Sequence, residues 1–91
     1  MDMLNVLQNL ILERKNFPKS KSYTSHLFNE KGLVERKINE EAYELIEASL
    51  NNEKEAVIEE AADLFYHILV MLSKQNVYLE DIYNSLRKRR K

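Results

Sequence analysis

The stretch from residue 33 to 75 reads LVERKINEEAYELIEASLNNEKEAVIEEAADLFYHILVMLSKQ, and it predicts two long helices joined by a tight turn. Apolar residues on both sides of Asn51-Asn52 recur every three to four positions, which is the spacing of one helix face. Asparagine tolerates the left-handed backbone that a turn requires, so the break is expected at this pair. The sequence therefore predicts a helical hairpin, with helices over about 33–50 and 53–75.

The rest of the chain is also predicted to be helical. Only one glycine and one proline occur among 91 residues, as expected for helices joined by short breaks. Pro18 and the run KSKS at 19–22 interrupt the helical pattern, and Gly32 is a candidate C-cap for the segment before it. No strand-like alternation rises above the helical signal. We expect an all-α bundle of four to five helices, the others covering about 2–14, 24–29 and 79–89.

Size and composition predict one small domain, residues 1–91, with a limited core. No cysteine is present to cross-link it, so association of identical chains is an expected further source of stability. The sequence shows no signal peptide, no disulfide pattern and no apolar run long enough for a membrane span. We therefore expect a cytoplasmic protein with no membrane partner.

Charge is distributed unevenly along the chain. The last five residues, 87–91, carry 5 of the 14 positive charges, and the remainder has 9 positive and 15 negative charges, a net of −6. Such a surface is poorly suited to nucleic acid, so no nucleic-acid partner is expected. The basic end fits the C-terminus of a helix, where cations favour the helix dipole. Contact of this end with a phosphate or a partner is the alternative.

Acidic residues lie at helical spacing in both halves of the hairpin: Glu40, Glu41 and Glu44 in the first helix, Glu60 and Asp63 in the second. Residues three apart share a helix face. A rotation of about 100° per residue places all of them except Glu40 at the edges of the apolar stripes. Glu44 precedes the turn by about seven residues and Glu60 follows it by about eight, so both pairs are expected at a similar height.

Four carboxylates at one height would repel one another, and a bound cation would relieve that repulsion. Oxygen ligands alone suit Mg²⁺ or Mn²⁺ better than Zn²⁺. The spacing therefore predicts a metal site whose ligands are Glu41, Glu44, Glu60 and Asp63. An ordinary charged helix edge is the alternative.

His67 lies one turn beyond Asp63. It is predicted to be a further ligand, a hydrogen-bond partner of a ligating carboxylate, or a histidine that only satisfies a neighbour. A di-iron bundle would require Glu-x-x-His motifs, and neither histidine of this chain follows a glutamate at that spacing.

Longer motifs carry a resemblance to a known family. They are Glu13-Arg14-Lys15, Ser22-Tyr23-Thr24 with Leu27-Phe28, Glu40-Glu41-Ala42-x-Glu44, and Glu60-Ala61-Ala62-Asp63-Leu64-x-Tyr66-His67 with Leu69-Val70. The acidic motifs are similar to those of the superfamily of all-α nucleotide pyrophosphohydrolases. Together with the Ser-Tyr-Thr and Tyr-His motifs, they make nearly the whole chain resemble the phosphoribosyl-ATP pyrophosphohydrolases of histidine biosynthesis.

The resemblance implies an all-α helix-bundle dimer or a higher homo-oligomer. It also implies Mg²⁺-dependent hydrolysis of phosphoribosyl-ATP to phosphoribosyl-AMP and pyrophosphate, with Mn²⁺ as a possible substitute. Glu41, Glu44, Glu60 and Asp63 match the metal-binding acids of the family, and the rotation argument selects the same four. Glu40 matches the remaining motif acid, for which we expect a role as base or in the outer shell; a hydroxide at the metal is the other candidate base.

Phosphates also need cationic and hydroxyl partners. The candidates for substrate binding are Arg14, Lys15, Ser22, Tyr23, Thr24, Lys37, Tyr66 and His67. Lys37 lies one turn before Glu41 and can instead form an ion pair with it. Ser22 or Thr24 can instead cap a helix, and Tyr66 can pack against the bundle rather than stack on a base.

Two other functions remain open from the sequence. A house-cleaning dNTP pyrophosphohydrolase of the same superfamily would keep the chemistry and change the substrate, although the Ser22-Tyr23-Thr24 and Tyr66-His67 motifs argue against it. A non-catalytic helical dimerisation module would use the acids as surface charge or to hold one structural cation.

Overall fold

The structure, a computed structural model, describes residues 2–90, and within that range it contains five α-helices and no strand. The helices are α1 (Met3–Asn16), α2 (Tyr23–Asn29), α3 (Leu33–Leu50), α4 (Lys54–Lys74) and α5 (Leu79–Arg89). The expected all-α fold is confirmed; the two ends of the predicted domain, 1 and 91, lie outside the described residues. None of these helices is long and apolar enough to cross a lipid bilayer.

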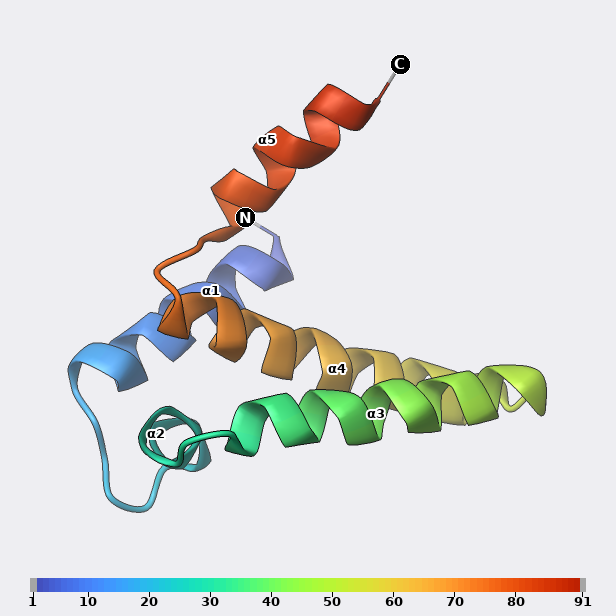
Figure 1. The fold of residues 1–91 in the computed structure, drawn as a ribbon, viewed down its shortest axis with the longest axis horizontal. Coiled ribbons are helices and arrows are strands. Elements are labelled where there is room, and N and C mark those ends of the chain that lie inside the picture. Colours follow the sequence, from blue (N-terminus) through green and yellow to red (C-terminus); the bar gives the residue numbers. More distant parts are fainter. Residues whose placement is uncertain (1, 91) are drawn as a thin grey trace.

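The helices are arranged around one long hairpin. Figure 1 shows α3 and α4 lying side by side, with α1 and α2 packed at the end away from the α3–α4 turn. The hairpin thus follows from the two apolar stripes on either side of Asn51-Asn52. It also places the acidic motifs of both helices on a common rigid support.

Left-handed backbone occurs at three breaks between helices. Asn52 has φ 57° in the turn between α3 and α4, as the asparagine pair predicts, and Asn76 has the same φ after α4. Gly32 has φ 80° and is the N-cap of α3, whereas α2 ends at its own C-cap, Glu30. The prediction that Gly32 caps the short helix before it was therefore wrong: its left-handed backbone starts the next helix.

The core lies where α1 and α2 meet the open end of the hairpin. Its buried apolar residues are Ile11, Leu27, Val34, Leu69, Val70 and Leu79. Toward the turn, α1 and α2 no longer cover the hairpin, and among residues 43–65 only Ala48 is buried. Ile46 of α3 and Phe65 of α4 are accordingly 58% and 53% exposed.

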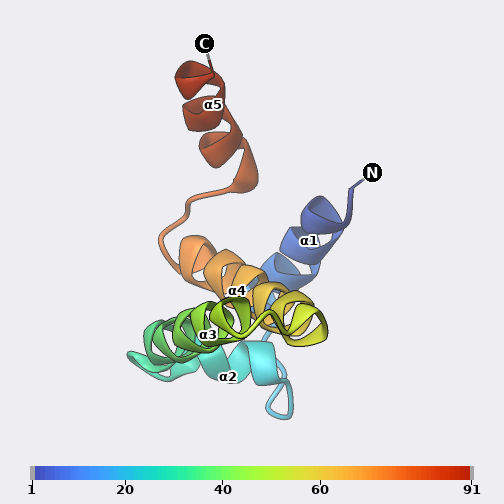
Figure 2. The ribbon, with the colours of Figure 1, turned by 90° about the vertical axis from the view of Figure 1, so that its right-hand side faces the viewer.

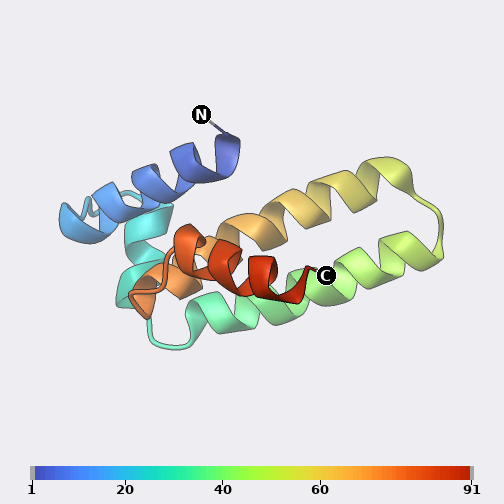
Figure 3. The ribbon, with the colours of Figure 1, turned by 90° about the horizontal axis from the view of Figure 1, so that it is seen from above.

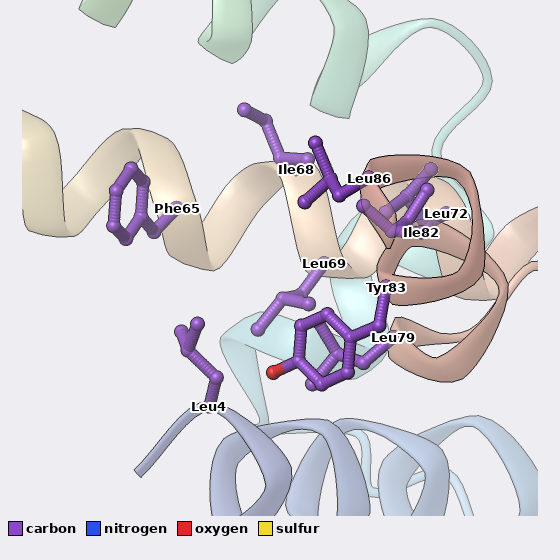
Figure 4. Close-up of a pocket in the computed structure, with 9 residues that line it drawn as sticks. All are labelled: Leu4, Phe65, Ile68, Leu69, Leu72, Leu79, Ile82, Tyr83 and Leu86. Atoms are coloured by element: carbon purple, nitrogen blue, oxygen red, sulfur yellow. The ribbon is translucent and has the colours of Figure 1, made fainter. Parts of the chain in front are cut away.

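The last helix is attached mainly through its first turn. The backbone N–H of Leu79 donates to Oε1 of Gln8 on α1 at 2.8 Å, and the Leu79 side chain is buried. Beyond that point α5 rises away from the hairpin, as two perpendicular views show (Figures 1 and 2). Between α1, α4 and α5 lies an apolar groove lined by Leu4, Phe65, Ile68, Leu69, Leu72, Leu79, Ile82, Tyr83 and Leu86 (Figure 4).

Candidate active site

The hairpin brings the two predicted acid pairs together across the α3–α4 contact. The two helices run beside each other along the hairpin (Figure 3). Glu41 and Glu44 of α3 are close enough to Glu60 and Asp63 of α4 for their charges to interact. The pKa of Glu60 is raised, first by its hydrogen-bonding contact with the Glu44 carboxyl, then by burial and by the charges of Glu44, Asp63 and Glu41. These four residues, called here the acid cluster, therefore act on one another electrostatically.

Glu41 is a largely buried member of the acid cluster that contacts His67. Its side chain is only 13% exposed, and its Oε1 lies 2.6 Å from Nδ1 of His67. Burial raises the pKa of Glu41; His67 partly offsets this, while Asp63 and Glu44 raise the pKa further. The ionised form of Glu41 is therefore disfavoured at this position, and His67 offsets this only in part.

A polar and aromatic wall from α2 and α4 stands beside Glu41. The Tyr23 hydroxyl lies 2.8 Å from Nε2 of His67, and the Thr24 hydroxyl is hydrogen-bonded to the hydroxyl of Tyr66. The rings of Tyr23 and Tyr66 are stacked with centroids 6.3 Å apart, and the His67 ring meets both edge-on. The pKa of Tyr23 is raised by burial, by Tyr66 and by Glu41, which places its hydroxyl close to the acid cluster.

The donor chemistry of the acid cluster fits a hard divalent cation. The four carboxylates of the acid cluster offer oxygen donors, which such a cation prefers, and their charges raise the pKa values of Glu41 and Glu60, which a cation would oppose. In addition, the buried Oε1 of Glu41 has no hydrogen-bond partner and could accept a cation. That oxygen lies near Nδ1 of His67, but the ring nitrogen bonds the Asp63 carbonyl oxygen at 2.9 Å. In residues 2–90, however, no three His, Cys, Asp or Glu side chains are already arranged to hold a metal ion.

Glu40 and Lys37 flank the acid cluster on α3. The Glu40 side chain is 58% exposed, and its Oε1 lies 3.6 Å from Nζ of Lys37, one turn earlier. Lys37 thus pairs with Glu40 and not with Glu41, the partner considered from the sequence. Glu40 also contributes to the raised pKa of Tyr23, so its negative charge acts on the first residue of α2.

The two predicted cations of α1 have partners elsewhere. The Arg14 guanidinium lies 3.1 Å from Oε1 of the adjacent Glu13. Lys15 donates from Nζ to the Ser73 carbonyl at 2.6 Å and to Oδ1 of Asn76 at 2.8 Å, at the C-terminal end of α4. That end is about ten residues, or about 15 Å along the helix, beyond the acids of α4. A substrate contact by Arg14 or Lys15 stays a prediction, which this arrangement does not favour.

Ser22 caps α2, so the helix-capping alternative is confirmed for this residue. Its Oγ accepts a hydrogen bond from the backbone N–H of Ser25 at 3.2 Å. The cap fixes the start of α2, whose first two residues are Tyr23 and Thr24. Both of these side chains then reach partners on α4.

The sequence indicated each of these side chains as a separate candidate for substrate binding and did not predict the hydrogen bonds between them. Tyr23 with His67, and Thr24 with Tyr66, depend on how α2 packs against α4, for which the chain carries no local signal. The bond from His67 to the Asp63 carbonyl spans four residues of one helix, so helical spacing alone could have indicated it.

The apolar groove is a separate feature from the acid cluster. Its lining contains no charged side chain (Figure 4). A ligand rich in phosphate would lose its hydration there without gaining a charged partner. The acid cluster and its aromatic wall are therefore the candidate site for a charged ligand.

Comparison with known proteins gives one family and several relatives. Residues 4–90 match the family described as phosphoribosyl-ATP pyrophosphohydrolase. The chain is 44% identical over 93 residues to a phosphoribosyl-ATP pyrophosphatase of Clostridium novyi, covering 100% of this chain and 84% of that protein. A phosphoribosyl-ATP pyrophosphatase of Metallosphaera sedula is 41% identical over 91 residues, with 99% and 98% covered. The chain is also 43% identical over 93 residues to the histidine biosynthesis bifunctional protein HisIE of Caldanaerobacter subterraneus, covering 100% of this chain and 45% of that longer protein.

Proposed function

The chain belongs to the phosphoribosyl-ATP pyrophosphohydrolase family, and from this premise we propose that it hydrolyses phosphoribosyl-ATP to phosphoribosyl-AMP and pyrophosphate with the help of Mg²⁺ or Mn²⁺. It is an enzyme, a hydrolase of a phosphoanhydride, and its place is in histidine biosynthesis. The observation that carries the proposal is the meeting of two acid pairs across the α3–α4 contact, with raised pKa values at Glu41 and Glu60.

Glu41, Glu44, Glu60 and Asp63 would hold the cation. The orphaned oxygen of Glu41 and the repulsion within the acid cluster support this assignment. When bound, the cation supplies positive charge that offsets both the carboxylates and the polyphosphate and polarises the phosphoryl group under attack. Since the side chains are not yet arranged for ligation, changes of rotamer accompany loading in this proposal.

The remaining residues of the site bind and orient the substrate and move a proton. The exposed carboxylate of Glu40, beside the acid cluster, accepts the proton of the attacking water. Water then displaces pyrophosphate in line, a reaction that depends on positioning and charge stabilisation. Lys37 supplies positive charge next to Glu40. The hydroxyls of Tyr23, Thr24 and Tyr66 supply polar contacts for the nucleotide, and the rings of the two tyrosines supply an aromatic surface.

The test is release of pyrophosphate from phosphoribosyl-ATP, with and without Mg²⁺, beside a panel of dNTPs. We expect Mg²⁺-dependent turnover of phosphoribosyl-ATP and little turnover of dNTPs. Glu41→Gln should abolish turnover, while Glu47→Gln, at an exposed position of the same helix, should leave it unchanged. Turnover of dNTPs instead would keep the metal chemistry and reject the substrate. A folded protein that turns over neither would favour the non-catalytic dimerisation module.

We also propose that the functional unit is a homodimer. Large apolar side chains are exposed on the part of the hairpin that α1 and α2 do not cover: Tyr43 66%, Ile46 58%, Leu50 71%, Ile58 56% and Phe65 53%. A chain of 91 residues has few other ways to bury such a surface. The same surface on a second copy is its natural complement in a symmetric dimer.

A further inference from the structure

His67 has no polar atom free for a ligand. The residue is only 5% exposed. Its Nε2 lies 2.8 Å from the Tyr23 hydroxyl, and its Nδ1 lies 2.9 Å from the Asp63 carbonyl oxygen and 2.6 Å from Oε1 of Glu41. Both ring nitrogens are therefore engaged within the protein, and a metal or a phosphate would have to displace one of these partners.

The partners also determine which ring nitrogen carries the hydrogen. A backbone carbonyl can only accept a hydrogen bond, so Nδ1 must be the donor to Asp63. In the neutral ring Nε2 then has a lone pair, and the Tyr23 hydroxyl donates to it. The imidazole is held on one side by α2 and on the other by its own helix, so its orientation is fixed.

We propose that His67 is a positioning residue for Glu41: held between the Tyr23 hydroxyl and the Asp63 carbonyl, it keeps Nδ1 beside the Glu41 carboxylate and so holds that carboxylate in place to receive the cation. This inference rests on the proposed function, because it assumes that Glu41 is a metal ligand. It removes His67 from the residues that touch substrate or metal, although the sequence named it as a substrate-binding candidate.

The geometry explains how His67 can fix the position of the Glu41 carboxylate without forming a hydrogen bond to its Oε1. The hydrogen on Nδ1 is bonded to the Asp63 carbonyl, and Oε1 of Glu41 remains without a hydrogen bond of its own. Nδ1, the nitrogen that carries this hydrogen, lies 2.6 Å from Oε1, and His67 lowers the pKa of Glu41, which partly offsets the cost of its burial. Oε1 thus keeps its lone pairs for a cation.

The first experiment determines which ring nitrogen of His67 carries the hydrogen in the metal-free protein. Nitrogen chemical shifts of the His67 ring in the ¹⁵N-labelled wild-type chain, measured near neutral pH, distinguish a protonated from a bare ring nitrogen. We expect Nδ1 to carry a hydrogen. A bare Nδ1 with the hydrogen on Nε2 would overturn the proposal.

The second experiment compares two variants that each keep one ring nitrogen. The amide nitrogen of asparagine can take the place of Nδ1, and that of glutamine the place of Nε2. Mn²⁺ affinity, measured without substrate from the electron paramagnetic resonance signal of free Mn²⁺, should fall about 10- to 100-fold in His67→Gln and stay close to wild type in His67→Asn. Equal losses in the two variants, or no loss in either, would overturn the proposal.

Tyr23→Phe serves as the variant that leaves the ring in place. It removes the hydroxyl that donates to Nε2, so we expect the Nε2 signal to shift while Nδ1 keeps its hydrogen, and Mn²⁺ affinity to fall less than in His67→Gln. An unchanged nitrogen spectrum would contradict the hydrogen bond from Tyr23. This variant keeps the test decisive even where a replacement of the buried His67 does not fold.

Failure of this inference can be told apart from failure of the proposed function. Wild-type protein that binds Mn²⁺ but does not hydrolyse phosphoribosyl-ATP would reject the function, while the contrast between the two His67 variants still tests the positioning role. An active enzyme in which His67→Gln raises only KM, with Mn²⁺ affinity unchanged, would reject the positioning role in favour of substrate contact. Wild-type protein that binds no Mn²⁺ would overturn the inference.

Discussion

At the scale of single residues, Glu60 shows most clearly that the acid cluster is unfavourable without a cation. Its pKa is raised by Glu44, Asp63 and Glu41 together. We therefore expect Glu60→Gln to raise the melting temperature in EDTA or leave it level, because a repelling charge is removed. In Mg²⁺ the wild type should gain stability and the variant should not. Turnover should fall on the order of 100-fold, as when a group that stabilises transition-state charge is removed.

Glu59→Gln is the matched control for this prediction. Glu59 is exposed, stands one position earlier on α4 and loses the same charge. It should leave the Mg²⁺ response and the turnover unchanged. A lower melting temperature for Glu60→Gln in EDTA, with Glu59→Gln unaffected, would mean that the acids stabilise the fold and do not repel one another.

The same residues predict how stability of the metal-free protein depends on pH. The pKa values of Glu41 and Glu60 are raised above the ordinary value of 4.5, so the folded state holds their protons up to a higher pH than the unfolded state does. The free energy of unfolding that these two groups contribute must fall as pH rises from 4.5 through their folded pKa values, and level off above them.

Denaturant titrations in EDTA across this pH range check the prediction. The difference in unfolding free energy between wild type and Glu41→Gln should change in that window and be constant above it. Mg²⁺ should oppose the loss, because it binds the ionised carboxylates of the folded state. A wild-type stability that rises through the window relative to the variant would contradict the direction of both pKa shifts.

At the scale of the helices, the contact between α1 and α4 provides a prediction that separates structure from substrate binding. Nζ of Lys15 bonds the Ser73 carbonyl and the Asn76 side chain, where a cation also favours the helix dipole. Lys15→Met should lower the unfolding free energy by about 1 to 2 kcal/mol, while KM for phosphoribosyl-ATP stays unchanged. Chemical denaturation and steady-state kinetics measure the two effects.

Lys21→Met is the control for this prediction, because Lys21 is an exposed lysine of the loop between α1 and α2. It should alter neither stability nor KM. A Lys15→Met variant that keeps its stability but raises KM would instead support the substrate contact that the sequence suggested for Lys15.

The helices show which parts of the fold could be read from the sequence. The bounds of α3 and α4 follow from local information, namely the apolar period of 33–75 and the asparagine pair in its middle. The similar height of the two acid pairs follows from counting the residues between each pair and that turn. The contact of Leu79 with Gln8 joins residues far apart in the chain, and no local pattern encodes it. The capping role of Lys15 and the pairing of α2 with α4 side chains escape prediction for the same reason.

At the scale of the whole molecule, the core covers one end of the hairpin, and the candidate active site adjoins it through α2. The core is concentrated near α1 and α2, while the part of the hairpin toward Asn52 exposes a broad apolar surface. The acids stand along the contact between α3 and α4. Covering the exposed surface in a dimer would also stabilise the helices that carry the acids, so we expect assembly to support activity.

Assembly is tested with a charge placed on the exposed apolar surface. Ile46 is 58% exposed in one chain, so Ile46→Glu should cost the isolated chain little, yet it would bury a charge in a dimer. Sedimentation velocity should show a dimer for the wild type and for Asn16→Glu, which adds the same charge at an exposed end of α1, and a monomer for Ile46→Glu. The melting temperature should depend on protein concentration only in the two dimeric proteins. A wild type that sediments as a monomer at every concentration, or an Ile46→Glu variant that remains dimeric, would place the interface elsewhere or remove it.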